Sequence, residues 1–286
     1  MKTLAHISDI HFGRVIPSVA ESLLAALAAD APDLVVISGD LTQRARRGQY
    51  RMARDFLNRI PFPKIVVPGN HDVPLYNVAR RFLRPLTRYR RYITRDMAPF
   101  YQDDEIAVLG INTARSLTFT KGRISEAQIE LIRRRFCPIP DNVFKILVTH
   151  HPFLPPPENL KLPLVRRAHK VLRMVAACNL DLLLAGHFHM SYAGGSHSAY
   201  RTLARSVLVI QAGTAASSRM RTEGNAYNLI HIHKARVTLR VRMWDGERFD
   251  DYRTRHYTYN TDGGWDHPTP PAPGAAPSEG ERSLEN

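Results

Sequence analysis

The sequence predicts a layered α/β fold in which helices flank mixed β-sheets. Six short apolar runs have the length and the β-branched content of buried strands, and helical or irregular segments separate each run from the next. The runs cover residues 4–7, 34–38, 64–67, 106–111, 146–149 and 182–185. Strands that alternate with helices in this way are typical of a sheet covered on both faces.

A helix is expected between the first two runs, which gives the chain a β-α-β opening. Residues 18–29 carry apolar side chains on one helical face, and Ser18 and Glu21 have the spacing of a capping box. Residues 227–233 and 236–244 alternate apolar and polar side chains, as antiparallel strands with one solvated face do. The later part of the sheet is therefore expected to be mixed.

One globular domain is expected over residues 1–259. The chain is 44% hydrophobic and 23% charged, which are ordinary values for a folded protein. Residues 78–97 contain seven arginines interleaved with aromatic and aliphatic side chains, and we predict a basic helical insertion there. From position 260 the composition shifts to Pro, Gly, Ala, Ser and charged residues, so residues 260–286 are predicted to be a disordered tail.

The net charge indicates the kind of partner, and the N-terminus and the cysteines indicate the cellular compartment. A formal charge of +14 favours anionic partners, whether phosphate-bearing ligands, nucleic acid or an anionic membrane surface. No run approaches the roughly 18 apolar residues of a membrane helix, and the N-terminus lacks a signal-peptide pattern, so a cytoplasmic protein is expected. The two cysteines, Cys137 and Cys178, have no C-x-x-C spacing, and we expect both to be buried and reduced.

Five of the strand-like runs end in clusters of Asp, Asn and His. Because the carboxyl ends of strands form the ligand crevice of an α/β sheet, these clusters are expected to converge on one site. Carboxylates, imidazoles and an amide without a thiolate suit divalent ions of the Mn, Fe or Zn type. The ligands are too many for one ion, so two ions are expected. The clusters contain Asp9, His11, Asp40, Asn70, His71, Asp72, His150, His151, His187 and His189.

The clusters follow the order D-x-H, G-D, G-N-H-D, a strand-terminal His, and G-H-x-H. Over residues 9–189 this order resembles the calcineurin-like metallophosphoesterases. The resemblance implies a layered α-β-β-α sandwich with two metal ions. It places Asp9, His11 and His189 on one ion, Asn70, His150 and His187 on the other, and Asp40 as the bridge between the two.

His151 competes with His150 for one ligand position. If the strand continues through both residues, they point to opposite faces, so that only one of them can coordinate. The resemblance favours His150.

The resemblance also implies two catalytic residues in the G-N-H-D block. His71 corresponds to the residue that contacts the scissile phosphate and helps to protonate the leaving oxygen, and Asp72 corresponds to the carboxylate that orients its imidazole. The implied reaction is in-line attack by metal-bound hydroxide, without a covalent phosphoenzyme.

Within this superfamily, residues 39–42, 67–72 and 110–113 are similar to class III cyclic-nucleotide phosphodiesterases. Gln43 stands where phosphoprotein phosphatases have the second Asp of G-D-x-x-D-R-G, which argues against a phosphoprotein substrate. A cyclic nucleotide or a similar small phosphodiester is therefore the expected substrate. The alternatives are a nuclease, a nucleotide-sugar or phospholipid pyrophosphatase of the same superfamily, and a polyanion-binding module without catalysis.

Overall fold

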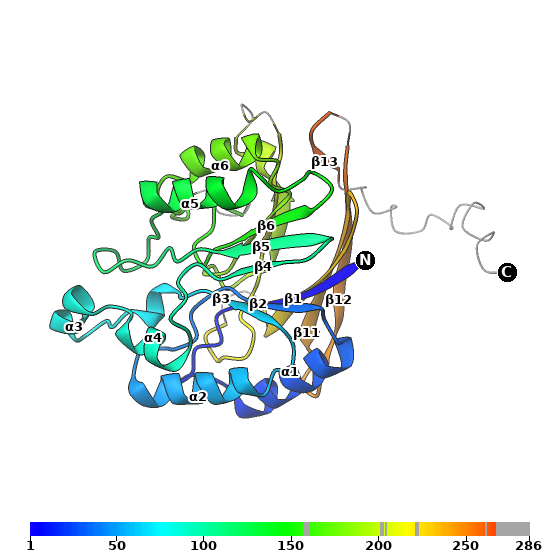
Figure 1. Cartoon of the computed structure of the whole chain (residues 1–286). Helices are drawn as coiled ribbons and strands as arrows, with labels where there is room; N and C mark the ends of the chain where they lie inside the picture. Colours follow the sequence, from blue (N-terminus) through cyan, green and yellow to red (C-terminus); the bar gives the residue numbers. More distant parts are fainter. Residues whose placement is uncertain (157–160, 201–202, 204, 221–222, 261, 267–286) are drawn as a thin grey trace.

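The computed structural model of the chain describes residues 1–156, 161–200, 203, 205–220, 223–260 and 262–266. Two mixed β-sheets lie face to face, and helices cover the outer face of each (Figure 1). This is the α-β-β-α arrangement that the sequence predicts. No helix among the described residues has the length and apolar character needed to cross a membrane.

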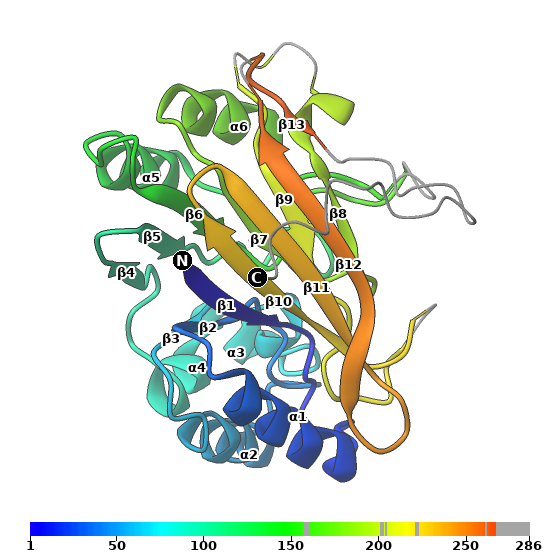
Figure 2. The same ribbon diagram turned by 90° about the vertical axis from the view of Figure 1, so that its right-hand side faces the viewer.

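The first sheet has the strand order β13-β12-β11-β10-β1-β2-β3. Its parallel part is β1 (Lys2–Ile7), β2 (Leu34–Ile37) and β3 (Lys64–Val66). Its antiparallel part is β10 (Ala226–His233), β11 (Arg236–Trp244), β12 (Phe249–Tyr259) and β13 (Trp265–Asp266). Figure 2 shows these strands in front of the second sheet. Helices α1 (Pro17–Asp30) and α2 (Arg47–Asn58) cover the outer face.

The second sheet has the strand order β4-β5-β6-β7-β9-β8. The strands are β4 (Phe100–Gln102), β5 (Ile106–Gly110), β6 (Phe144–Val148), β7 (Leu182–Ala185), β8 (Tyr192–Gly195) and β9 (Leu208–Gln211). Helices α5 (Glu126–Phe136) and α6 (Ala168–Ala177) pack on its outer face. The short helices are η1 (Asn70–Asp72), α3 (Val78–Leu83), α4 (Thr87–Tyr92) and η2 (Ser196–Ser198).

Three apolar layers hold the sandwich together. Alternate residues of β1 explain how: Leu4 faces the second sheet, whereas Ala5 and Ile7 face α1 and α2. A strand buried on both faces has a continuous apolar sequence, so the six predicted apolar runs lack alternation. Each predicted strand is confirmed to within two residues at each end.

One helical prediction, the capping box, needs correction. Helix α1 begins at Pro17, and Ile16 is its N-cap without a side-chain hydrogen bond, so Ser18 and Glu21 form no capping box. The carboxylate of Glu21 instead pairs with the guanidinium of Arg59 at 2.5 Å. The basic insertion contains two short helices, α3 and α4, because Pro85 follows the end of α3.

The prediction of two reduced, buried cysteines is wrong except for the burial of Cys178. Cys137 and Cys178 are paired as a disulfide, with their Cα atoms 4.5 Å apart, and Cys137 is exposed. These residues follow α5 and α6 directly, and the two helices pack side by side, so their carboxyl ends meet. At the other end of the chain, β13 pairs with β12 beyond position 259, and residues 267–286 of the predicted tail lie outside the described residues.

Candidate metal centre

The seven sequence-predicted ligands lie close together at strand ends from both sheets. Asp9, His11 and Asp40 follow β1 and β2, Asn70 begins η1, and the three histidines follow β6 and β7. Contacts join the segments: Asp9 Oδ2 accepts a hydrogen bond from the amide of His187 at 3.0 Å, although 178 residues separate them. The convergence expected from the strand ends is therefore present.

Backbone conformation at the ligands is strained. Ten residues other than glycine have positive φ among those described, and half of them are candidate ligands. They are Asp9 (φ 54°), His11 (51°), Asp40 (53°), His187 (76°) and His189 (59°). Such a conformation costs about 1–3 kcal/mol per residue and persists where surrounding structure enforces it, which is common at functional sites.

Close backbone approach explains two glycines of the motifs. A Cβ atom on Gly69 would lie 2.1 Å from Asp40 Oδ1, and one on Gly186 would lie 1.9 Å from Ser8 Oγ. A side chain at either position would push a carboxylate or its hydrogen-bond donor out of place. The glycines of G-N-H-D and G-H-x-H therefore leave the room that Asp40 and Ser8 need.

Asp9 turns one carboxylate oxygen toward two imidazoles. Its Oδ2 accepts hydrogen bonds from Ser8 Oγ at 2.6 Å and from the amide of His187. Its Oδ1 lies 3.4 Å from His11 Nε2 and 3.5 Å from His189 Nε2. Thr214 Oγ1 lies 2.7 Å from Nδ1 of His189 and so holds the ring with Nε2 directed at Asp9.

Asp40, like Asp9, has one carboxylate oxygen that accepts a hydrogen bond and one that faces imidazoles. Its Oδ1 accepts a hydrogen bond from the amide of His71 at 2.8 Å. Its Oδ2 lies 3.8 Å from His11 Nε2 on one side and 3.4 Å from His150 Nε2 on the other. One oxygen of Asp40 therefore lies between the two predicted ligand sets.

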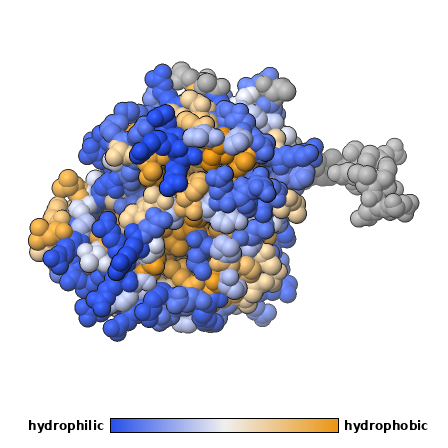
Figure 3. Space-filling view, viewed as in Figure 1, coloured by the Kyte–Doolittle hydropathy of each residue, from blue (hydrophilic) through white to orange (hydrophobic). Residues whose placement is uncertain are grey.

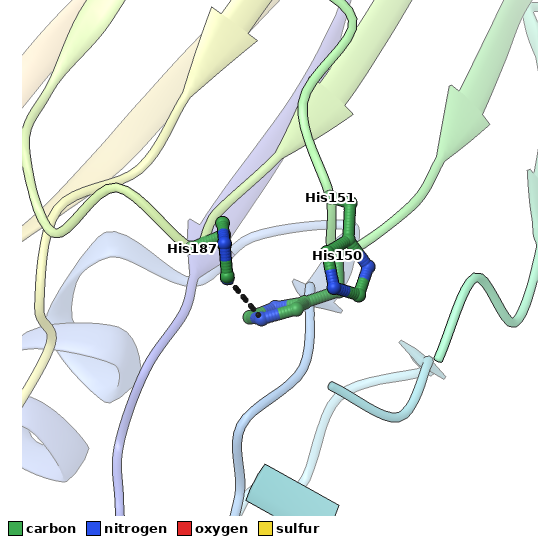
Figure 4. A group of neighbouring side chains, drawn as sticks. All are labelled: His150, His151 and His187. Carbon is green, nitrogen blue, oxygen red and sulfur yellow. Dashed lines mark hydrogen bonds between the residues drawn. The ribbon is translucent and has the colours of Figure 1, made fainter. Parts of the chain in front are cut away.

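The geometry separates His150 from His151. His150 Nδ1 lies 2.8 Å from the carbonyl of Ser38, and its Nε2 lies 3.1 Å from Asn70 Oδ1 and 3.2 Å from His187 Nδ1. His151 instead has its Nδ1 2.7 Å from Thr113 Oγ1. Figure 4 shows these three imidazoles where the loops after β6 and β7 meet. His150 is the one that shares contacts with Asn70 and Asp40.

Burial and the two carboxylates set the protonation states of the histidines at the centre. Burial lowers the pKa of His187 to about 3 and that of His189 to about 4, so both imidazoles are neutral near pH 7. Burial raises the pKa of Asp9 and of Asp40, but the surrounding histidines outweigh it and hold both well below the usual range. Burial opposes a charge on His150, yet Asp40 and Asp9 raise its pKa to about 9. In the metal-free chain a proton on His150 offsets the two carboxylates.

Unpartnered electron-pair donors show that the residues fit metal ions. Asp9 Oδ1 and both ring nitrogens of His11 are buried and have no hydrogen-bond partner among the described residues. Three groups of side chains have donor atoms within 4.8 Å of one another. They are Asp9 with His11 and His189, Asp9 with Asp40 and His150, and His150 with His151 and His187. Buried carboxylate and imidazole donors directed at one another are suited to hold a cation between them.

The two residues predicted to be catalytic have different surroundings. His71 Nδ1 lies 2.9 Å from the carbonyl of Gln43, so this nitrogen carries the hydrogen and Nε2 bears the lone pair. Asp72 does not contact the imidazole of His71. Its carboxylate accepts hydrogen bonds from the amides of Leu41, Thr42 and Gly69 and from Thr42 Oγ1. The Gln43 carbonyl therefore orients His71, and the orienting role expected of Asp72 is corrected.

Two arginines flank His71. Arg219 Nη1 lies 2.8 Å from His71 Nε2, and Arg44 Nη1 lies 3.2 Å from His71 Nδ1. Arg44 follows the G-D block closely enough to be expected at the rim. Arg219 and Thr214 were not predicted from the sequence. The signal that could have found them is the Gly and polar segment that follows β9 at residues 213–218.

Comparison with known proteins agrees with this centre. Residues 2–191 match the calcineurin-like phosphoesterase family, which covers about two thirds of the chain. The chain is a calcineurin-like phosphoesterase. It is accordingly a metal-dependent phosphoric ester hydrolase, and its Asp and His clusters could hold metal ions.

Two curated relatives of this phosphoesterase are named as phosphodiesterases. Glycerophosphodiester phosphodiesterase GpdQ of Enterobacter lignolyticus is 27% identical over 65% of this chain and 70% of its own length. A probable cyclic nucleotide phosphodiesterase of Synechococcus is 31% identical over 25% of this chain and 32% of its own length.

A solved structure supports the fold. A dimetal phosphatase from Danio rerio covers 91% of this chain and 99% of its own length, with a TM-score of 0.66 and 14% identity.

Proposed function

We propose that this phosphoesterase hydrolyses a small phosphodiester, such as a cyclic nucleotide, with two divalent ions of the Mn, Fe or Zn type. The observation that carries the proposal is the Asp40 carboxylate. Its Oδ1 is held by the amide of His71, while its Oδ2 faces an imidazole of each ligand set. A carboxylate placed in this way suits a bridge between two ions.

The ligand sets follow from the contacts around that bridge. Asp9, His11 and His189 would hold one ion, and Asn70, His150 and His187 would hold the other. Bound ions of this kind polarise a phosphoryl oxygen and make a hydroxide nucleophile available near neutral pH. The carbonyl of Ser38 and the hydroxyl of Thr214 fix the rings of His150 and His189 from behind.

His71 is the proposed proton donor to the leaving oxygen. With Nδ1–H held by the Gln43 carbonyl, its Nε2 is the nitrogen that can face substrate. In the free protein Arg219 donates to this Nε2. An arriving phosphate would take over the guanidinium of Arg219, and the freed Nε2 of His71 would take up a proton from solvent. The resulting imidazolium would then give that proton to the departing alkoxide.

A diester is favoured over a monoester because the two curated relatives described above carry phosphodiesterase names, one for glycerophosphodiesters and the other, marked probable, for cyclic nucleotides. Arg44 and Arg219 add positive charge beside His71, which suits an anionic phosphoryl group.

The test is hydrolysis of bis(p-nitrophenyl) phosphate by the purified full chain with Mn, Fe, Zn or Co, compared with the chelated protein. We expect turnover that requires metal. The His71→Ala variant should keep its metal and turn over about 100-fold or more slowly. His256→Ala, at an exposed position on β12, is the matched control and should behave as wild type. Absence of turnover with every metal, or normal turnover by His71→Ala, would contradict the proposal.

A further inference from the structure

Large apolar side chains are exposed together on α3 and on the loop that faces it. Each is between 50% and 80% exposed. The set, named here the apolar tip, is Tyr76, Val78, Phe82, Leu83, Leu117 and Phe119. Figure 3 shows apolar surface at the edge of the molecule where Figure 1 draws α3. A cluster of exposed large apolar residues marks an interaction site.

A buried arginine joins the two parts of the apolar tip. Arg81 of α3 is only 2% exposed, and its guanidinium donates to the carbonyls of Pro74, Ser116 and Thr118. It also lies 4.2 Å from the ring centroid of Phe119. Arg81 therefore holds α3 and the loop at residues 116–118 together, and both carry exposed apolar side chains.

Arginines line two cavities next to the apolar tip. One, of about 490 Å³, lies between α3, α4 and residues 112–116 and is lined by Arg84, Arg90 and Arg115. The other, of about 150 Å³, is lined by Arg47, Arg80, Arg84, Arg88 and Arg91. Neither lining contains a carboxylate.

Few carboxylates accompany this concentration of positive charge. Residues 78–97 contain seven arginines and a single carboxylate, Asp96. Within the described part of the chain, the ion pairs include none of the arginines that line the two cavities. Guanidinium groups held close together repel one another until an anion joins them.

We propose that the apolar tip and its arginine-lined cavities dock on the surface of an anionic lipid bilayer. Apolar side chains enter the boundary of the acyl region, and lipid phosphates occupy the arginine-lined cavities. A second copy fits poorly, because a symmetric contact would bring arginines against arginines. Nucleic acid fits the arginines, but it gives no reason for Leu83 and Leu117 to be 80% exposed.

The docking surface adjoins the metal centre without sharing its ligands. Tyr76 of the apolar tip packs 5.7 Å from the Arg44 guanidinium, and Arg44 contacts His71. A docked protein would therefore hold its active site at the lipid surface. Binding itself needs no metal, so the inference does not rest on the proposed function.

The test is flotation of the metal-free full chain with vesicles of phosphatidylcholine alone or mixed with phosphatidylglycerol. We expect at least about tenfold more protein on the mixed vesicles, and a loss of binding in high salt. Leu83→Ser with Leu117→Ser, and separately Arg84→Glu with Arg91→Glu, should each reduce binding about tenfold or more. All four positions are exposed, so the variants should fold. Tyr252→Ser and Arg248→Glu, at exposed positions distant in the chain, are the matched controls and should bind as wild type.

Three results would overturn the proposal. The first is equal binding to neutral and anionic vesicles. The second is unchanged binding by the Leu83→Ser, Leu117→Ser double variant. The third is absence of vesicle binding together with either oligonucleotide binding or a dimer that the same variant dissociates, which would assign the surface to nucleic acid or to a second copy. Hydrolysis of bis(p-nitrophenyl) phosphate by these variants should stay at the wild-type level, so failure here is distinguishable from failure of the metal centre.

Discussion

The metal centre and the apolar tip are close neighbours, since Arg44 contacts both, yet they are built in opposite ways. At the centre, buried polar side chains are held in a strained backbone by strand ends from both sheets. At the tip, apolar side chains are exposed on two short segments that Arg81 joins. The contrast suggests that catalysis needs fixed distances, whereas docking needs an accessible surface. Changes in one region should therefore leave the function of the other intact.

The largest effect should come from a pair of adjacent histidines. His150→Ala removes an imidazole that faces Asp40 and Asn70, so we expect loss of one ion and a fall in kcat/KM of more than about 100-fold. His151→Ala removes a buried ring that is bonded to Thr113, so we expect the metal content to be kept and the free energy of unfolding to fall by about 1–3 kcal/mol. Elemental analysis and urea denaturation measure the two quantities.

The assignment of His150 rather than His151 as the ligand is wrong if His151→Ala loses metal while His150→Ala retains both ions. Vesicle flotation of both variants should match wild type, because neither residue contacts the apolar tip.

The ligand set could be predicted from sequence because coordination chemistry restricts residue types and the strands restrict their place. Asp9, Asp40 and His150 each follow an apolar run within a few positions, and parallel strands bring their carboxyl ends together. The positions of Arg219 and Thr214 depend on the path of the loop after β9, which one sequence does not specify. Asp72 was given the wrong partner for a similar reason, since its oxygens face the amides of the loop after β2.

The tip was harder to predict. The arginines of residues 78–97 were visible in the sequence, and Pro85 was a signal that the insertion contains two helices. Nothing local indicated that Leu117 and Phe119 would lie beside α3, because Arg81 makes that contact across 35 to 37 residues. The disulfide between Cys137 and Cys178 likewise depends on how α5 and α6 pack.

A smaller effect is expected from a pair of glycines. Gly69→Ala places a methyl group 2.1 Å from Asp40 Oδ1, so we expect a loss of about 1–3 kcal/mol in the free energy of unfolding and reduced metal affinity. Gly48→Ala, in the first turn of α2, meets nothing within 4 Å and should stabilise the helix by up to about 1 kcal/mol. Urea denaturation and metal titration compare them. Equal changes in the free energy of unfolding and in metal affinity for the two variants would contradict the close contact between Gly69 and Asp40.

The smallest effect on the whole fold should come from the arginine that joins the apolar tip. Arg81→Ala leaves the carbonyls of Pro74, Ser116 and Thr118 without their donor, and water can replace the guanidinium at Ser116 and Thr118, which are only part-buried. We expect a change of about 1 kcal/mol in the free energy of unfolding, faster proteolysis within residues 74–120 and weaker vesicle binding, with unchanged kcat for bis(p-nitrophenyl) phosphate. Arg80→Ala, one position away and half-buried, keeps the joint and should leave the proteolysis rate unchanged. If Arg81→Ala lowers kcat as strongly as His150→Ala does, the apolar tip is needed for catalysis, and the functional independence of the two regions is wrong.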